Sequence, residues 1–236
     1  MQAAAIVGYK NSGKTSLMLR LTEHLSNKGL RVAAVKFTHH GLDRPGADTE
    51  QLSHLAHCVA GLGPEQTSLF WNKPFSLGDL LPLLDSDLLL IEGGRHLQTL
   101  PRIILAQDNG EVEALADGLA FGIWSETITN PGIPSFQDIP SLSEQIRNRA
   151  FMLPGLDCQA CGYETCGQLA RAILSGHADV QSCQAVSQEL TISVNGEQLA
   201  LNPFVRSIIS GSILGMLCNL KGFAPGAIDI HLDRPV

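Results

Sequence analysis

The chain has 236 residues, 44% of them hydrophobic, and a formal net charge of −7 at pH 7. This length has room for one good-sized domain and a smaller appendage, and the composition is sufficient for a full hydrophobic core. The acidic balance argues against a nucleic-acid partner, because neutralising phosphates requires a basic face.

The N-terminal sequence MQAAAIVGYK has no positive region followed by an apolar one, so we expect no signal peptide. We also expect no membrane span, because no apolar run reaches roughly 18 residues. Six cysteines without an export signal favour a cytoplasmic location, where clustered cysteines more often bind metal than form disulfides. Cys58 and Cys218 lie outside the cluster and are expected to be buried small hydrophobic residues.

The first elements predict a βαβ unit. Ala3–Val7 is an apolar strand that ends at Gly8, Thr15–Lys28 has leucines at helical spacing, and Arg31–Thr38 is a second strand. Gly29 follows the helix as a C-cap. A strand, a glycine loop, a helix and a second strand imply a parallel sheet with a right-handed crossover.

The loop of this unit, Gly8-Tyr9-Lys10-Asn11-Ser12-Gly13-Lys14-Thr15, matches the Walker A pattern with the strand and helix in the right places. Its glycines let backbone N–H groups turn onto phosphate oxygens, and the helix N-terminus adds its positive dipole end. Lys14 can reach the β- and γ-phosphates, and Thr15 can place a hydroxyl on Mg²⁺. The alternative is a chance match in a glycine-bearing turn.

The chain up to about residue 150 continues to alternate strands and helices, which is typical of the α/β class. After the loop His39–Asp48, the expected elements are helix Thr49–His57, strands Cys58–Ala60 and Gln66–Trp71, helix Leu77–Leu84, strands Asp87–Ile91, Arg102–Ala106 and Gly118–Trp124, and helix Pro140–Arg149.

A second motif of nucleotide sites lies at Leu88-Leu89-Leu90-Ile91-Glu92, an apolar strand ending in an acid. Glu92 would bind Mg²⁺ through water or orient the attacking water, and the alternative is a solvated carboxylate at a strand end. Asp48 is a weaker candidate for the metal shell, since Asp in a Pro-Gly loop often serves the turn. We find no Asn/Thr-Lys-x-Asp motif for guanine, so the base stays open.

These motifs together resemble the molybdopterin-guanine dinucleotide biosynthesis protein B family. The resemblance covers about residues 1–150 and depends on Gly8–Thr15, Val35-Lys36-Phe37-Thr38-His39-His40, Asp43-Arg44-Pro45-Gly46-Ala47-Asp48 and Leu90-Ile91-Glu92-Gly93. It implies a dimeric P-loop GTP-binding fold that assists the guanylyltransferase attaching GMP to molybdopterin. It also implies that His39, His40 and Asp48 face the nucleotide or the cofactor. Arg95 stands where the family pattern has a lysine.

Adjacent strand residues point to opposite faces, so at most one of His39 and His40 can face a γ-phosphate. A hydrogen-bonded structural histidine is the alternative for each. We therefore predict Lys14 and Glu92 as catalytic residues and Thr15 and Glu92 as Mg²⁺ residues. The predicted nucleotide-binding set is Gly8, Asn11, Ser12, Gly13, Lys14, Thr15, Ser16, His39 and Asp48.

Four cysteines follow as Cys158-x2-Cys161-x4-Cys166-x16-Cys183. Four thiolates can hold one [4Fe–4S] cluster, and a short helix from Cys166 would pack behind it. A structural zinc site is the main alternative, but it usually uses paired C-x2-C units, and a disulfide framework is a weaker one. Residues 153–185 resemble the iron–sulfur domain of electron-transfer subunits related to RnfB and of corrinoid iron–sulfur proteins.

The rest of the chain predicts a linker turn at Leu153-Pro154-Gly155 and, near the end, a hairpin, a helix and a strand. Asn195-Gly196 marks the hairpin. Asn202 caps a helix running from Pro203 to about Lys221, with Gly222 just past its end, and Ala227–Leu232 reads as a final strand. We expect the helix to pack its apolar face on the hairpin and this strand rather than on a partner.

The expected fold is therefore an α/β P-loop NTPase with a mainly parallel sheet flanked by helices, plus an iron–sulfur domain and a C-terminal α+β segment. The expected divisions are 1–150, 151–190 and 191–236.

The leading hypothesis is a homodimeric GTP-binding accessory protein of molybdenum or tungsten cofactor maturation, with weak GTPase activity, Mg²⁺ and a [4Fe–4S] cluster. By resemblance its partner would be a molybdopterin guanylyltransferase or a molybdoenzyme. The alternatives are a nucleotide-gated iron–sulfur carrier or electron donor for a metalloenzyme, and a nucleotide-binding adaptor without turnover.

Overall fold

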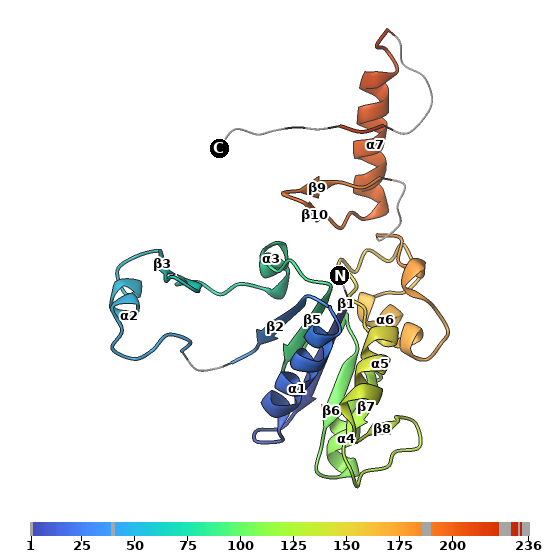
Figure 1. The fold of residues 1–236 in the computed structure, drawn as a ribbon. Coiled ribbons are helices and arrows are strands. Elements are labelled where there is room, and N and C mark those ends of the chain that lie inside the picture. The colour runs from blue at the N-terminus through green and yellow to red at the C-terminus, as the bar shows by residue number, and fades with distance from the viewer. Residues whose placement is uncertain (1, 39–40, 186–189, 222–227, 231, 233–236) are drawn as a thin grey trace.

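The computed structural model describes residues 2–38, 41–185, 190–221, 228–230 and 232. A six-stranded sheet forms its centre, with strand order β2-β5-β1-β6-β7-β8 and parallel pairing throughout (Figure 1). The strands are β1 (Gln2–Gly8), β2 (Val32–Lys36), β5 (Leu88–Glu92), β6 (Arg102–Leu105), β7 (Ala120–Trp124) and β8 (Ser135–Phe136). The expected parallel sheet is confirmed.

Helices cover both faces of this sheet. α1 (Lys14–Asn27) and α5 (Ile139–Arg149) share one apolar cluster with alternate residues of the strands, and α4 (Asn109–Ala116) shares the other. α3 (Leu77–Leu80) and the 3-10 turn Leu81–Leu83 extend the second cluster. Because both faces are covered, β1 and β5 are apolar along almost their whole length rather than alternating.

Three of the remaining elements lie between β2 and β5 in the sequence and outside the six-stranded sheet. α2 (Asp48–Ser53) is followed by β3 (Cys58–Leu62) and β4 (Thr67–Trp71), which pair antiparallel as a separate two-stranded sheet (Figure 1). The sequence predicted these elements but not their separation. It missed α4, which has only eight residues, and β8, which has only two.

The cysteine segment packs against the body of the protein. α6 (Cys166–Leu174) and the 3-10 turn Val180–Ser182 bury Leu169, Ala170, Cys166 and Cys183 together with Leu119, Phe151 and Leu153. Leu153 is only 2% exposed, and its N–H donates to the carbonyl oxygen of Thr99 at 2.9 Å. The expected linker is therefore anchored to the sheet domain, and residues 151–159 form no hydrogen-bonded turn.

The C-terminal segment begins as predicted. β9 (Ser193–Val194) and β10 (Glu197–Gln198) flank Asn195 and Gly196, whose positive φ angles of 53° and 85° are those of a type I′ turn. α7 (Pro203–Leu217) starts with the Asn202 side chain accepting from the Val205 N–H.

The predicted end of this helix near Lys221 is wrong. The side-chain amide of Asn219 donates to the Gly215 carbonyl oxygen at 2.6 Å and competes with helical continuation. Gly222 lies outside the described residues.

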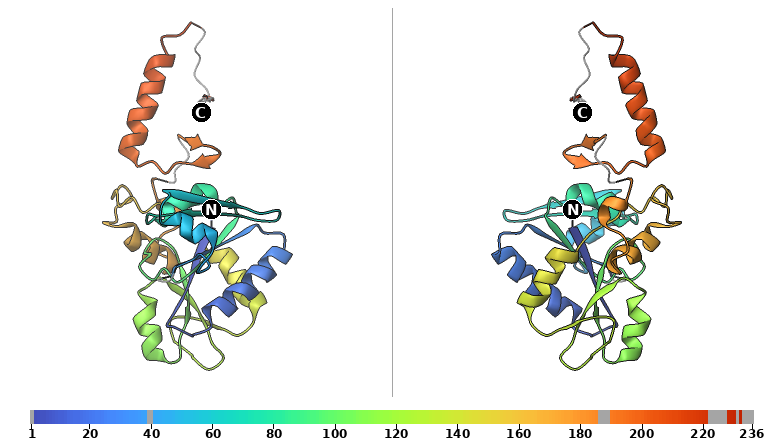
Figure 2. Two further views of the ribbon diagram at one scale, coloured as in Figure 1. Left: turned by 90° about the vertical axis from the view of Figure 1, so that its left-hand side faces the viewer. Right: turned by 90° about the vertical axis from the view of Figure 1, so that its right-hand side faces the viewer.

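The predicted packing of α7 is also wrong. Phe204 is 73% exposed and Met216 66%, and Ile208 and Leu214 are exposed too. Figure 2 shows α7 standing clear of the sheet, and two-residue strands are too short to cover it. Within the expected final strand, the described residues 228–230 and 232 form no strand. Cys218 is exposed and Cys58 half-buried, so the expected burial of these two is wrong.

Among the described residues, none of the helices combines the length and apolar character needed to cross a bilayer.

Candidate functional site

The loop after β1 has the backbone shape that the Walker A pattern requires. Asn11 and Gly13 have positive φ angles of 63° and 91°, and α1 begins at the next residue. A Cβ on Gly8 would lie 2.5 Å from both the Leu105 carbonyl oxygen and Ser12 Oγ, so only glycine fits there. No side chain caps the N-terminus of α1, which leaves its first N–H groups available for phosphate oxygens.

Lys14 lies over this loop rather than extending into water. Its Nζ donates to the Tyr9 carbonyl oxygen and lies 3.4 Å from Ser12 Oγ. Ser16 is exposed on the first turn of α1. The predicted phosphate residues from Gly8 to Ser16 thus lie on one continuous turn.

Glu92 lies beside Thr15, as the two motifs predicted. β5 is the direct neighbour of β1, so its last residue ends at the same edge of the sheet as the loop. Glu92 is only 7% exposed, and the Thr15 hydroxyl lies 2.9 and 3.0 Å from its two carboxylate oxygens. A hydroxyl and a buried carboxylate in contact are oxygen ligands of the kind Mg²⁺ takes in P-loop sites.

A third residue joins this pair that the sequence did not assign to the site. Lys36 ends β2 in register with Glu92, and its Nζ lies 3.0 Å from Glu92 Oε1 and 3.4 Å from Thr15 Oγ1. The sequence signals are that Lys36 belongs to the Val35–His40 motif and that it ends a strand of the βαβ unit, where parallel strands converge.

Two glycines turn the chain away after Glu92. Gly93 and Gly94 have φ angles of 87° and 67°, and a Cβ on Gly94 would lie 2.9 Å from Leu97 and 3.1 Å from Phe37. Arg95 donates to the Ala114 carbonyl oxygen of α4, so its charge serves the end of that helix.

The other predicted residues are not joined to the loop. Asp48 begins α2, on the part of the chain that leaves the sheet, and in the described residues it makes no hydrogen bond to the phosphate loop. His39 and His40 lie outside the described residues.

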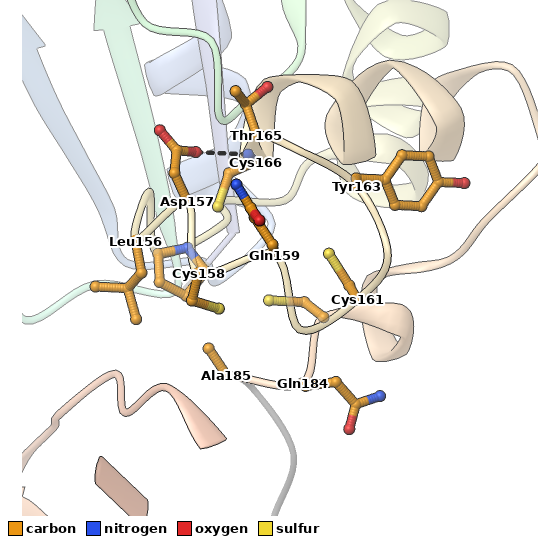
Figure 3. Close-up of a pocket in the computed structure, with 12 residues that line it drawn as sticks. Leu156, Asp157, Cys158, Gln159, Cys161, Tyr163, Thr165, Cys166, Gln184 and Ala185 are labelled. Atoms are coloured by element: carbon orange, nitrogen blue, oxygen red, sulfur yellow. Dashed lines mark hydrogen bonds between the residues drawn. The ribbon is translucent and has the colours of Figure 1, made fainter. Parts of the chain in front are cut away.

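The four clustered cysteines line a single cavity, together with Asp157 and Gln159 (Figure 3). Cys166 is the first residue of α6, and its N–H donates to Asp157 Oδ1 at 2.6 Å. Burial is the main cause that raises the pKa of the Cys166 thiol, and the nearby Asp157 carboxylate also contributes.

Zinc and a [4Fe–4S] cluster require different positions of the thiols. A zinc site would bring four thiolates to about 2.3 Å from one point. A [4Fe–4S] cube takes its four thiolates at four separate irons. The four thiols of this chain surround one cavity and are soft ligands that suit either group.

The two candidate sites lie at opposite edges of the sheet (Figure 1). The phosphate loop follows the carboxyl end of β1, whereas the cysteine segment packs on Leu119, just before β7 begins. β1 has seven residues at about 3.3 Å each, which separates the edges by roughly 20 Å. Residues 93–101 run from one edge to the other, because they join the end of β5 to the start of β6.

Arg171 of α6 attaches the cysteine segment to this connection. Its Nε donates to the Asp117 carbonyl oxygen at 2.8 Å, and its Nη2 lies 3.0 Å from Asp117 Oδ2 and also contacts Gln98 Oε1. Burial alone would raise the pKa of Asp117, but the hydrogen bond with Gln98 and the charge of Arg171 outweigh it and lower that pKa. A Cβ on Gly167 would lie 3.1 Å from Gln98, so α6 approaches closely.

Replacing Arg171 with Ala should loosen this attachment. The side chains of Arg171 and Asp117 are 37% and 50% exposed. We therefore expect the free energy of unfolding to fall by about 1–2 kcal/mol and the midpoint of thermal unfolding to fall by about 2–6 °C. Arg147→Ala, at an exposed position of α5, is the matched control and should change the midpoint by less than about 1 °C. Equal midpoints for the two variants would contradict this role for Arg171.

Two family models match this chain. The model described as "Molybdopterin guanine dinucleotide synthesis protein B" matches residues 3–120, half of the chain. The model described as "Putative Fe-S cluster" matches residues 153–185, the segment that contains all four clustered cysteines.

Individual proteins show the same likeness. A Methanocaldococcus jannaschii protein named "Putative molybdopterin-guanine dinucleotide biosynthesis adapter protein" is 26% identical, over 99% of this chain and 98% of its own. The molybdopterin-guanine dinucleotide biosynthesis adapter protein of Haemophilus influenzae is 31% identical over 42% of this chain and 60% of its own. The crystal structure of Bacillus subtilis MobB is 25% identical, with a TM-score of 0.54, and covers 64% of this chain and 99% of that one. The first likeness extends through the cysteine and C-terminal segments.

Proposed function

Because this chain belongs to the molybdopterin guanine dinucleotide synthesis protein B (MobB) family, we propose that it is a GTP-binding adapter in molybdenum or tungsten cofactor maturation. The observation that carries this proposal is the contact of Thr15 with the buried Glu92 beside the phosphate loop. Its partner would be the enzyme that attaches GMP to molybdopterin, or the molybdoenzyme that receives the product, and it would act as a homodimer.

In this proposal the residues of the loop act by positioning and by charge. The N–H groups from Asn11 to Thr15 bind phosphate oxygens, and the Lys14 ammonium leaves the Tyr9 carbonyl to contact the β- and γ-phosphates. Mg²⁺, held by Thr15 and by Glu92, directly or through water, would neutralise charge on those phosphates.

Hydrolysis should be slow in the isolated protein. Glu92 accepts a hydrogen bond from the Thr15 hydroxyl and is assigned to the metal shell, so it is poorly placed to take a proton from water as well. Any GTPase activity would therefore be weak and would depend on a partner.

We propose that Cys158, Cys161, Cys166 and Cys183 hold one [4Fe–4S] cluster. The roughly 20 Å between the two edges of the sheet means that the cluster acts on a partner rather than on the bound nucleotide. The proposed units remain residues 1–150 for the nucleotide, 151–190 for the cluster and 191–236 for the C-terminal segment.

A nucleotide-gated iron–sulfur carrier or electron donor is the second candidate. The feature that favours it is the connection formed by residues 93–101, which begins beside Glu92 and includes Gln98, the partner of Arg171. Single-electron reduction of the cluster that depends on the bound nucleotide would favour this candidate over the adapter.

The proposed function is tested by titrating anaerobically purified protein with GTP and ATP, with and without Mg²⁺, and measuring turnover in the presence and absence of molybdopterin. We expect GTP to bind more tightly than ATP when Mg²⁺ is present, with turnover near background in the isolated protein. Binding of neither nucleotide would contradict the proposal. Binding without turnover under every condition would contradict the weak GTPase activity and favour a nucleotide-binding adaptor without turnover.

A further inference from the structure

Lys36 lies where the metal ion of the proposed function would lie. Its ammonium contacts Glu92 Oε1 at 3.0 Å and Thr15 Oγ1 at 3.4 Å. These are the two side chains that we assign to Mg²⁺. We infer that Lys36 is a resident cation that fills the magnesium position in the nucleotide-free protein and is exchanged for Mg²⁺ when the metal arrives with a nucleotide.

The need for a resident cation comes from Glu92. Its side chain is only 9% exposed, and a carboxylate removed from water is costly unless a positive charge and hydrogen bonds compensate it. Among the described residues, Lys36 is the one cation in ion-pair contact with Glu92. Without a nucleotide, the pair keeps the site electrically balanced and the strand ends in register.

The Lys36 side chain can withdraw from Glu92 because of its exposure and its shape. Its side chain is 52% exposed, so the stem reaches the carboxylate from the solvent side and can withdraw without opening the core. Lysine is a compact charge on a flexible stem, so it can move between a carboxylate and a phosphate at little cost.

The exchange makes metal binding conditional on the nucleotide. Without a nucleotide, Mg²⁺ must lose water ligands and displace the Lys36 ammonium, and it gains only two protein ligands, Thr15 and Glu92. This exchange is unfavourable because Mg²⁺ gives up its water ligands reluctantly. With a nucleotide, the phosphates supply further oxygen ligands and a new anionic partner for Lys36. Metal and nucleotide should therefore bind cooperatively, each raising the affinity of the other by the same factor.

The test uses Mn²⁺ as the probe and the nucleotide-free full chain, with bound Mn²⁺ measured by electron paramagnetic resonance. Lys36→Met removes the charge and keeps the length, Lys36→Arg keeps the charge, and Lys28→Met changes an exposed lysine at the far end of α1. We expect Lys36→Met to bind Mn²⁺ about tenfold or more tightly than wild type. Lys36→Arg and Lys28→Met should stay within about twofold of wild type.

Equal Mn²⁺ affinity in Lys36→Met and wild type would overturn the inference. Should Lys36→Met fold poorly, Lys36→Gln replaces it. The measurement is then the rise in the midpoint of thermal unfolding when Mn²⁺ is added, and this rise must be larger for Lys36→Gln than for wild type. The inference rests on the proposed Mg²⁺ role of Thr15 and Glu92. Failure of the inference can be distinguished from failure of the proposed function. A wild-type protein that binds no nucleotide contradicts the function, whereas the Mn²⁺ comparison of Lys36→Met with wild type is made without nucleotide.

Discussion

Lys14→Ala is expected to weaken nucleotide binding about 10- to 100-fold while leaving the iron and sulfide content of the protein unchanged. A hydrogen bond from a charged group contributes about 1.5–3 kcal/mol, and 1.4 kcal/mol corresponds to a factor of ten. The proposed cluster should be unaffected because the cysteine segment packs at the other edge of the sheet. Isothermal titration with GTP and Mg²⁺ measures the affinity, and metal and sulfide analysis of the same sample measures the cluster.

The matched control is Lys28→Ala, which removes a lysine from the opposite end of the same helix. It makes the net charge of the chain more negative by the same amount but is far from the phosphate loop, so the affinity of this variant should stay within about twofold of wild type. Similar affinities for the two variants would show that Lys14 acts only through overall charge and would contradict its assignment to the phosphates.

The second large effect is expected from Cys161→Ser, which should lower the iron content from about four per chain to less than one. A serine hydroxyl is a poor substitute for a soft thiolate, and the remaining three cysteines leave one iron of the cube without a thiolate ligand, so the cluster is held less tightly. Iron and acid-labile sulfide analysis of anaerobically purified protein, together with its visible absorbance, measures the loss. GTP affinity should change by no more than about twofold, because sites this far apart act nearly independently.

Cys218→Ser is the control for this experiment, since Cys218 is exposed at the end of α7 and lies outside the cavity of the four cysteines. It should retain the full iron and sulfide content. Retention of the cluster in Cys161→Ser, or its loss in Cys218→Ser, would contradict the proposed ligand set.

The contact of Thr15 with Glu92 could be predicted from the sequence. The glycines of the loop determine where the backbone turns, and each of the two motifs follows an apolar strand, so in a parallel sheet both residues lie at the same edge. Lys36 could not be assigned to them, because its position depends on the pairing of β2 with β5, which no residue pattern specifies. The contact also requires the lysine stem to turn toward the carboxylate.

The position of the cysteine segment was beyond prediction for a similar reason. The spacing of the cysteines predicts a set of ligands and a class of metal site, but it says nothing about the surface on which the segment packs. That surface is set by Leu119, Phe151 and Leu153, which are buried together with α6. The Leu-Pro-Gly sequence predicted a linker turn, whereas residues 151–159 form no hydrogen-bonded turn and Leu153 is anchored to the sheet domain.

The C-terminal helix shows where periodicity misleads. The apolar residues of α7 suggested a face packed within the chain, yet burial needs an opposing surface, and the described part of the chain offers only a short hairpin. The Asn202 cap and the Asn195-Gly196 turn were predicted correctly, because each depends on only a few neighbouring atoms.

We propose that one chain holds a nucleotide at one edge of its sheet and an iron–sulfur cluster at the other. The most direct test is iron, sulfide and zinc analysis together with GTP titration on a single anaerobic preparation of the full chain. We expect about four irons and four sulfides per chain, no stoichiometric zinc, and one GTP bound in the presence of Mg²⁺. A colourless preparation containing zinc, or one that retains no nucleotide, would contradict the claim.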